Sequence, residues 1–423
     1  MTGMHGIQRR TFLKGVTVAG MAAVGSRMFD SAPPSEAVFT ALPARAPLQA
    51  EVPMRSFEEI RELMLERART RRNPFTYTRY DEVAAVLARL DSTDPDTWAE
   101  AFSALALPYE ERAAAAEAAG DIETARENYL IAYDYYHVAR YPAPTSPGKM
   151  RAYRRAQENY LRAARYFDPP LEVVEMPFRG RPGEGNAVIG HLRKPRGVAE
   201  PLPVVVLWGG IDAFKEDRNP DMYLNAGFAT LSIDMPGVGD APLVGSEDAE
   251  RMWDAVFDWI ATRPDLDAQR VGIHGGSTGG YWATKLAHTH RERIRAAINQ
   301  GGAVHYAFEA DWIAKAQVGE YPFELAETLA HAFGLTSYDE WVAYAPRLSL
   351  LRQGVLDQPC APLLLINGVH DSVFPIQDMY LLLEHGSPKA ARFFPVGHMG
   401  NTPETPTIMV RWMQEQLPGE RSR

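Results

Sequence analysis

The chain has 423 residues, of which 46% are hydrophobic and 23% charged, values that exclude a disordered or fibrous protein. Its 54 acidic and 44 basic side chains give a net charge of −10, which disfavours a nucleic acid as partner because phosphate backbones bind basic surfaces. The single cysteine, Cys360, excludes an intrachain disulfide framework and a thiolate metal cluster, and no apolar run is long enough to span a membrane.

The N-terminus carries a paired-arginine motif. Arg9 and Arg10 precede Thr-Phe-Leu-Lys, a short apolar run covers residues 15–25, and a stretch rich in proline, alanine and serine follows. This order predicts a twin-arginine export signal, processed between about residues 26 and 46. The alternative is a basic amphipathic tail. Residues 1–46 are therefore set apart from the fold.

Residues 47–168 are predicted to form a helical domain. Apolar side chains recur at helical spacing from residue 56 onward, and Asp94-Pro95-Asp96 and Pro108 are interpreted as helix starts and stops. Two longer segments, 121–141 and 149–167, carry alanine and tyrosine every three to four residues. No tetratricopeptide period recurs, so we expect a packed helical bundle rather than a repeat array.

After residue 168 the pattern changes to strands. Two alternating β-branched runs, 171–178 and 187–193, are separated by a turn rich in Gly, Pro and Glu, which predicts an antiparallel pair. Later runs are short, continuously apolar and separated by helical stretches, as buried parallel strands are. Residues 169–423 are thus predicted to be an α/β domain with a doubly wound, mostly parallel sheet.

A nucleophile motif lies between a predicted strand, 270–274, and a predicted helix, 281–290. Gly275-Gly276-Ser277-Thr278-Gly279 has the Gly-x-Ser-x-Gly pattern of the nucleophile elbow, in which small flanking residues permit a tight turn that exposes the serine hydroxyl. The glycine order fits neither a dinucleotide fingerprint nor a phosphate-binding loop. Ser277 is the predicted nucleophile.

The elbow architecture predicts an acid and then a base further along the chain. Asp371 follows the apolar strand 362–367, and His398 lies in a glycine-bracketed loop before the last predicted helix, 407–417. We expect Asp371 to orient His398, with Asp378 as the alternative acid.

The other histidines are given structural roles. His370 is at most a support for the site, His274 is expected to pack beneath the elbow, and His288 and His290 cannot face one ligand together from a helix. Because no zinc-binding spacing of histidine or cysteine occurs, neither a metal nor a cofactor is predicted.

The oxyanion hole is predicted from two backbone donors. One is the N–H of Thr278, the residue after the nucleophile, and the other comes from the loop after the third strand, where Gly210 or Ile211 supplies it. The turn at 234–239 is interpreted as structural.

A helical insertion is expected over residues 303–344. Its many aromatic side chains suit a lid that lines an apolar pocket, although a packed helix pair is an equal alternative. Glu309 and Asp311 are weaker candidates for polarising a ketone or enol.

The motifs together resemble the α/β-hydrolase superfamily. The Tyr/Ala-rich helices at 121–167, the Gly-Gly-Ile-Asp-Ala-Phe-Lys-Glu loop at 209–216 and the Asn-Gln-Gly-Gly-Ala-Val-His segment at 299–305 resemble one group within it. That group comprises the dihydroxypseudooxynicotine hydrolases, the fungal polyketide-shortening hydrolases and the fermentation–respiration-switch esterases. The resemblance implies that the N-terminal helices form a cap over the active site. It also implies cleavage of esters, or of carbon–carbon bonds next to a ketone.

The sequence therefore predicts an exported serine hydrolase that acts on a small, largely apolar molecule through Ser277, His398 and Asp371. A peptidase of prolyl-oligopeptidase type and a non-catalytic binding protein are the alternatives, and whether the chain forms a homodimer is left open. If Tyr133 or Tyr136 of the cap faces the pocket, its replacement by alanine is expected to change substrate preference more than stability; which cap residues line the pocket is left open.

Overall fold

The structure is a computed structural model that describes residues 54–418. The twin-arginine signal and processing zone predicted for residues 1–46 lie outside the described residues. Residues 51–423 form one compact unit, so the predicted division of this unit at residue 168 stays a prediction. Within residues 54–418, no helix is both long and apolar enough to cross a membrane.

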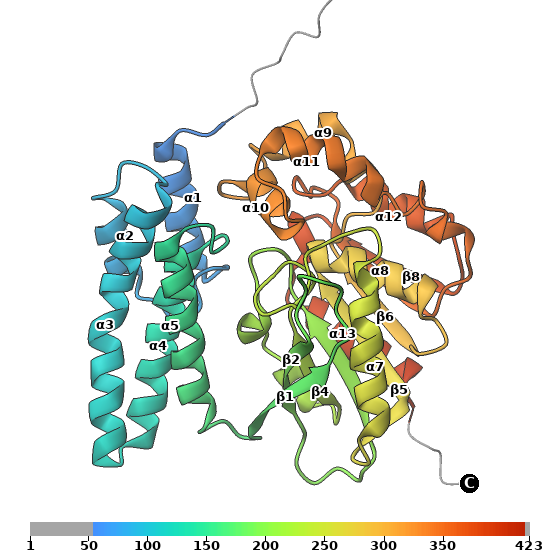
Figure 1. Ribbon diagram of the computed structural model, residues 1–423, viewed down its shortest axis with the longest axis horizontal. Helices are drawn as coiled ribbons and strands as arrows, with labels where there is room; N and C mark the ends of the chain where they lie inside the picture. The colour runs from blue at the N-terminus through green and yellow to red at the C-terminus, as the bar shows by residue number, and fades with distance from the viewer. Residues whose placement is uncertain (1–53, 419–423) are drawn as a thin grey trace, which may run out of the picture. The chain divides into compact units, whose positions relative to one another are not determined.

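A group of helices precedes the sheet (Figure 1). These helices are α1 (Phe57–Thr70), α2 (Tyr80–Leu87), α3 (Pro95–Ala119), α4 (Ile122–Arg140) and α5 (Pro147–Ala164). Local sequence sets their ends: Ser56 and Glu59 form a capping box at the start of α1, and Asp94 caps α3 by accepting from the Thr97 N–H. Helix α1 ends at Arg71, whose φ of 52° lies in the left-handed region.

The predicted helix stop at Pro108 is wrong, because Pro108 lies inside the 25-residue helix α3. A proline within a helix removes one backbone hydrogen bond and crowds the preceding turn. Here the helix continues because its flanks pack into the bundle: Phe102, Ala106 and Tyr109 are buried, and α3 packs against α4 and α5. Tertiary packing therefore outweighs the local cost of the proline.

The eight strands form one mixed sheet in the order β1-β2-β4-β3-β5-β6-β7-β8, which confirms the predicted fold class. The strands are β1 (Leu171–Pro177), β2 (Ala187–Arg193), β3 (Leu202–Trp208), β4 (Ala229–Ile233), β5 (Leu266–Gly276), β6 (Ala296–Gln300), β7 (Leu363–Gly368) and β8 (Lys389–Phe394). Strands β1 and β2 pair antiparallel, as predicted, and β2 pairs antiparallel with β4. The pairs from β4 to β8 are all parallel.

Helices cover both faces of this sheet. Along β3, Val204 and Val206 belong to one hydrophobic cluster, whereas Val205 belongs to another on the opposite face, as the alternation of a strand requires. The helices after β3 are α6 (Asp221–Leu224), α7 (Met252–Thr262), α8 (Thr278–Thr289), α9 (Ala310–Ala316), α10 (Leu325–Ala332), α11 (Tyr338–Tyr344), α12 (Ile376–Leu383) and α13 (Thr405–Gln416). Continuous burial of β3, β4 and β6 explains their uninterrupted apolar sequences.

The buried carboxylate of Asp217, in the loop after β3, binds three side chains of α4. Asp217 accepts from His137 at 2.9 Å and from Arg140 at 2.8 Å, and the hydroxyl of Tyr133 donates to it as well. Arg140 also donates to the carbonyl of Asp212 at 3.0 Å. Burial alone would raise the pKa of Asp217, but the charges of its two basic partners hold that pKa well below its usual range.

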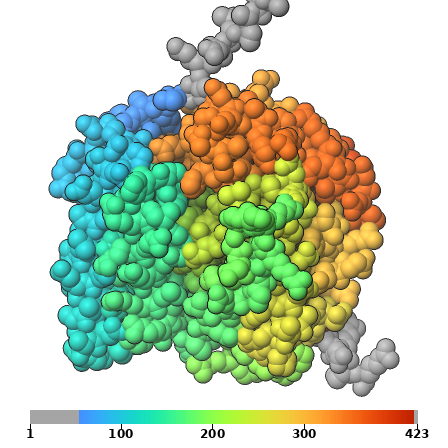
Figure 2. All heavy atoms as spheres, in the orientation of Figure 1, coloured from blue at the N-terminus to red at the C-terminus, as the bar shows by residue number. Residues whose placement is uncertain are grey.

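The insertion after β6 is helical, as predicted, and contains α9, α10 and α11. Its segment 319–322, between α9 and α10, contacts α1: Arg67 donates to the Glu320 carbonyl at 2.9 Å, and Arg55 donates to the Tyr321 carbonyl at 2.6 Å. In Figure 2 the blue surface of α1 meets the orange surface of this insertion. These hydrogen bonds thus attach the insertion to α1 and to Arg55, which precedes it.

Candidate active site

Ser277 occupies a strained turn between β5 and α8. Its φ of 54° and ψ of −131° lie outside the regions that side-chain-bearing residues normally adopt. The turn is held because the Ser277 N–H donates to the Gln300 carbonyl of β6 at 2.8 Å, and the Gly280 N–H donates back to the Ser277 carbonyl at 2.8 Å. Strain maintained in this way is characteristic of functional positions.

The glycines on both sides of Ser277 are required because neighbouring backbone atoms leave no room for a Cβ at these positions. A Cβ on Gly275 would lie 2.1 Å from the Gly279 carbonyl oxygen, and a Cβ on Gly279 would lie 2.3 Å from that of Gly209. Both separations are too short for any side chain. The Gly-x-Ser-x-Gly pattern therefore reflects close approach of three backbone segments, one of which is the loop that follows β3.

The structure brings Ser277, His398 and Asp371 together. His398 Nε2 lies 2.8 Å from Ser277 Oγ, and His398 Nδ1 lies 2.8 Å from Asp371 Oδ2. The other Asp371 oxygen accepts from the N–H groups of Val373 and Phe374, at 2.8 and 3.0 Å. These bonds fix the carboxylate, which leaves Oδ2 directed at the imidazole.

The electrostatics of this chain of contacts favour a protonated imidazole. Burial by itself would lower the pKa of His398, but the adjacent Asp371 carboxylate, helped by Glu320 and Asp212, raises that pKa above its ordinary value. The Asp371 side chain is fully buried. A histidine held in this way can accept a proton from the serine hydroxyl while the aspartate stabilises the resulting cation.

The alternative acid, Asp378, does not contact His398. Its carboxylate accepts from the backbone N–H groups of residues 304–307, at 2.7 to 3.4 Å, and so anchors the start of the insertion. Burial raises the pKa of Asp378 to about 6, against the opposing effect of those N–H donors. Its position beside the insertion's backbone gives it a structural role.

The remaining histidines lie apart from the serine hydroxyl. His370 is exposed, and His274 is buried between Tyr223 and Gln300, where burial lowers its pKa to about 4. His288 contacts the Gln358 carbonyl, and His290 contacts Asp254. Among the described residues, no group of three or more His, Cys, Asp or Glu side chains could hold a metal ion.

Two of the three predicted oxyanion donors lie against Ser277. A Cβ on Gly210 would be 3.1 Å from Ser277 Oγ and 3.4 Å from the Thr278 nitrogen, so only glycine allows this approach. Thr278 is the first residue of α8, where the N–H has no acceptor within the helix. Within residues 54–418, the Gly210 and Ile211 N–H groups donate to no protein group, so either can be the second donor.

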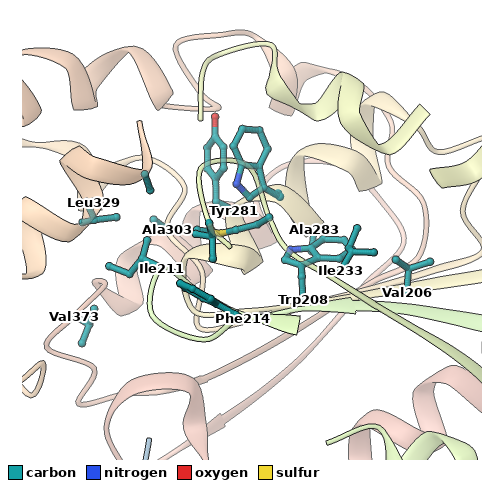
Figure 3. Close-up of a cluster of buried hydrophobic side chains, with 14 of the residues drawn as sticks. Val206, Trp208, Ile211, Phe214, Ile233, Tyr281, Ala283, Ala303, Leu329 and Val373 are labelled. Carbon is teal, nitrogen blue, oxygen red and sulfur yellow. The ribbon is translucent and has the colours of Figure 1, made fainter. Parts of the chain in front are cut away.

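The loop that carries these donors is rigidly anchored. Figure 3 shows Ile211 and Phe214 in one buried cluster with Trp208 and with Leu329 of α10. Lys215 is buried and contacts Asp234 at 3.0 Å through its ammonium group, while its N–H donates to the same carboxylate at 2.7 Å. The predicted structural role of the 234–239 turn agrees with these contacts.

A cavity of about 600 Å³ lies over Ser277 and His398. The sequence predicts an apolar pocket, but the wall is mixed: most of the residues that line it are polar or charged, while apolar atoms supply about half of its surface. Of the aromatic side chains in residues 303–344, all of which the structure describes, Tyr321 alone lines this cavity. Several of the others, among them Phe308, Phe323 and Trp341, pack into the core, whereas Tyr306 is exposed. Glu309 pairs with Arg352, and neither it nor Asp311 borders the cavity.

The two candidate tyrosines of the N-terminal helices, Tyr133 and Tyr136, lie away from this cavity. Tyr133 bonds to Asp217 and Tyr136 bonds to Glu110 at 3.1 Å, and neither borders the cavity over Ser277. The cap reaches that cavity through a different part: the last turn of α1 and the loop after it, residues 67–73. A basic helix end commonly complements the helix dipole, so the sequence offered no reason to single it out.

Glu320 is a site residue that the sequence did not reveal. Its carboxylate accepts from the His398 N–H at 2.7 Å and from the Ser372 N–H at 3.3 Å, and so joins the loops that carry the base and its acid partner. It lies in the short segment between α9 and α10, far from His398 in the chain. No local motif marks such a residue.

Comparison with known proteins shows the family to which the chain belongs. A family model described as Esterase FrsA-like matches residues 94–400, well over half of the chain. The Esterase FrsA of Photorhabdus laumondii is 26% identical over 286 residues, 66% of each protein, and that of Vibrio vulnificus is 25% identical over 334 residues, 76% of each. The chain thus spans just under two thirds of the length of the first of these relatives.

Solved structures agree on the fold. The 2,6-dihydroxy-pseudo-oxynicotine hydrolase aligns with a TM-score of 0.66 at 22% identity, covering 85% of this chain and 95% of its own. AbyA5 aligns with a TM-score of 0.60 at 23% identity, covering 79% of this chain and 92% of its own. With the sheet, the elbow and the family match taken together, the chain belongs to the esterase FrsA-like family of α/β-hydrolases.

Proposed function

We propose that this protein hydrolyses carboxylic esters through an acyl-enzyme on Ser277. The observation that carries the proposal is the continuous chain of contacts from Ser277 through His398 to Asp371 on the wall of a cavity. Removal of the hydroxyl proton by His398 Nε2 makes Ser277 Oγ nucleophilic toward the ester carbonyl. Asp371 holds the imidazole in orientation and stabilises its cationic form.

The negative charge on the former carbonyl oxygen is stabilised by the N–H of Thr278 and that of Gly210 or Ile211. Collapse of this intermediate breaks the bond to the alcohol oxygen, and His398 returns its proton to the leaving alkoxide. Water, deprotonated in turn by His398, then attacks the acyl-enzyme and releases the acid. The strained turn at Ser277 supports this mechanism because it holds the hydroxyl in place before substrate binds.

Substitution of Ser277 by alanine tests the proposal. We expect kcat for p-nitrophenyl esters to fall about 10⁴-fold or more, since nucleophile and base act as a unit. A fluorophosphonate probe should label the wild type and fail to label Ser277→Ala, which also separates an enzyme from a binding protein. Ser387→Ala, an exposed serine away from the cavity, is the matched control and should keep full activity. Wild-type turnover by folded Ser277→Ala would refute the mechanism.

The same groups can cleave a carbon–carbon bond next to a ketone, with an enolate carbon as the leaving group. Ester hydrolysis is the favoured chemistry because the matching family is one of esterases, and because Glu309 and Asp311 are absent from the cavity wall. Aromatic β-diketones belong in the substrate panel. Faster cleavage of these than of any ester would reverse the assignment.

We also propose export by the twin-arginine route. Its support is the Arg9-Arg10 pair and the apolar run that follows it.

A further inference from the structure

Four arginines border the cavity over Ser277, in a protein whose net charge is −10. Arg67, Arg71 and Arg72 come from the end of α1 and the residues after it, and Arg218 comes from the loop that follows β3. Two carboxylates, Asp212 and Glu320, also border the cavity. The wall therefore carries an excess of positive charge beside the nucleophile.

These arginines are poorly neutralised. Among the described residues, no ion pair involves Arg218: the neighbouring Asp217 pairs with Arg140 instead, and the buried Nε of Arg218 has no hydrogen-bond partner. Arg67 and Arg71 donate to backbone carbonyls, of Asn73 and of Thr76. The Arg72–Glu320 pair, at 3.6 Å, is the single ion pair found for the four. A guanidinium left without a carboxylate in a half-buried wall is suited to binding an anion from outside.

Neither of the two carboxylates neutralises Arg218. Glu320 accepts from the backbone of His398 and of Ser372, and Asp212 accepts from the Asn73 side chain at 3.0 Å. Neither is placed to pair with Arg218 within 4.0 Å. Arg218 also lines a separate cavity with Glu216, Asp217 and Asp221, but these carboxylates pair with other basic side chains. The positive charge of Arg218 thus stays available in the cavity over Ser277.

The position of Arg218 puts this charge near the reaction centre. Its Nη1 lies 3.9 Å from the point where a Cβ on Gly276 would stand, and Gly276 directly precedes the nucleophile. Arg71 and Arg72 are exposed, and so lie toward solvent. An anion would therefore meet exposed arginines first and a half-buried one beside Ser277, an order that favours both attraction and retention.

We infer that the substrate is an anionic ester, with a carboxylate-type group that binds Arg218 while Ser277 attacks the ester carbonyl. This inference rests on the proposed esterase function and replaces the apolar substrate predicted from the sequence. The anionic group takes no part in the bond changes, which remain those of ester hydrolysis. Planar guanidinium matches a carboxylate through two parallel hydrogen bonds, so lysine should substitute for Arg218 only in part.

Two esters of similar acyl length test the inference: mono-p-nitrophenyl glutarate, whose acyl chain ends in a carboxylate, and neutral p-nitrophenyl valerate. We expect kcat/KM for the glutarate ester to exceed that for valerate by about tenfold or more in the wild type. Arg218→Gln should lower this ratio by about tenfold, and Arg218→Lys by less. Arg392→Gln, which removes an exposed charge away from the cavity, should leave the ratio unchanged.

A second pair places the anion on the alcohol side, p-acetoxybenzoate against phenyl acetate. A preference for the anionic member of either pair that depends on Arg218 supports the inference and shows which side of the ester carries the charge. A preference for the neutral member of both pairs, or a ratio that Arg218→Gln leaves unchanged, overturns it while leaving the esterase function standing.

Binding separates the two proposals when no ester is hydrolysed. Titration calorimetry with Ser277→Ala uses mono-p-nitrophenyl glutarate as the probe, which that variant should not consume. Binding that the additional Arg218→Gln change weakens about tenfold supports anion recognition even if the esterase proposal fails. Equal binding by both variants, or no binding, overturns the anion inference.

Discussion

Replacing Glu320 by alanine is expected to slow ester hydrolysis without unfolding the protein. The Glu320 carboxylate accepts from the backbone N–H of His398 at 2.7 Å and from that of Ser372 at 3.3 Å. It therefore positions the base relative to Ser277 without touching the reacting atoms. A hydrogen bond to a charged group is worth about 1.5–3 kcal/mol. If all of that energy is lost from the transition state, kcat falls by about tenfold to a hundredfold.

A second variant, Glu320→Gln, separates position from charge. The amide oxygen can still accept from the His398 N–H, so kcat should fall less than in Glu320→Ala. Because the negative charge of Glu320 contributes to the raised pKa of His398, removing it lowers that pKa. The base is active when neutral, so the acid limb of the kcat/KM profile should move to lower pH in both variants.

The assay is the pH dependence of kcat and KM for a p-nitrophenyl ester, alongside the melting temperature. Glu309→Ala is the matched control, since Glu309 lies in the same insertion, pairs with Arg352 and does not border the cavity. It should leave the profile unchanged. An unshifted acid limb and full kcat in Glu320→Ala would show that Glu320 does not position His398.

Three further outcomes are expected. In the wild type, kcat/KM should rise with pH, and the midpoint of this rise should lie above the ordinary histidine pKa near 6.5, because the pKa of His398 is raised and its neutral form is the base. A midpoint below 6.5 would contradict this. Tyr133→Phe removes a hydrogen bond to buried Asp217, so chemical denaturation should show about 1–3 kcal/mol less stability, with relative rates across an ester series unchanged; altered selectivity would show that this ring does reach the substrate. Arg9→Lys with Arg10→Lys should retain the protein in the cytoplasm, and cell fractionation that finds the wild type there too would refute the export proposal.

The parts of the fold that the sequence predicted are those set by local patterns. Continuous apolar runs identified the buried parallel strands. The Gly-x-Ser-x-Gly motif identified the turn at Ser277, because the turn itself brings Gly275 against the Gly279 carbonyl and leaves no room for a Cβ. The order of Asp371 and His398 along the chain located the histidine that contacts Ser277 and the aspartate that contacts this histidine. The predicted helix stop at Pro108 is wrong because the effect of a proline depends on the packing of the surrounding helices, which no local pattern reports.

The character of the cavity could not be predicted in the same way. Arg67, Arg71 and Arg72 lie at a helix end, where basic residues ordinarily face solvent, and only the docking of α1 brings them to the nucleophile. Arg218 is one of several charged residues in its loop. Only interatomic distances show that no carboxylate among the described residues forms an ion pair with it. The aromatic side chains of the insertion suggested an apolar pocket, yet most of them stabilise the core.

The contacts of segment 319–322 determine what a truncated or chimeric form of this protein must retain. One side of the segment receives Arg55 and Arg67 from the first helix and its approach, and the other side holds the backbone of His398. An α/β domain expressed without the N-terminal helices would keep Ser277, His398 and Glu320, but segment 319–322 would lose its contacts with Arg55 and Arg67. Chimeras that exchange caps between relatives should therefore transfer this short segment together with the helices. Hydrolytic rate would then report whether a foreign cap has docked.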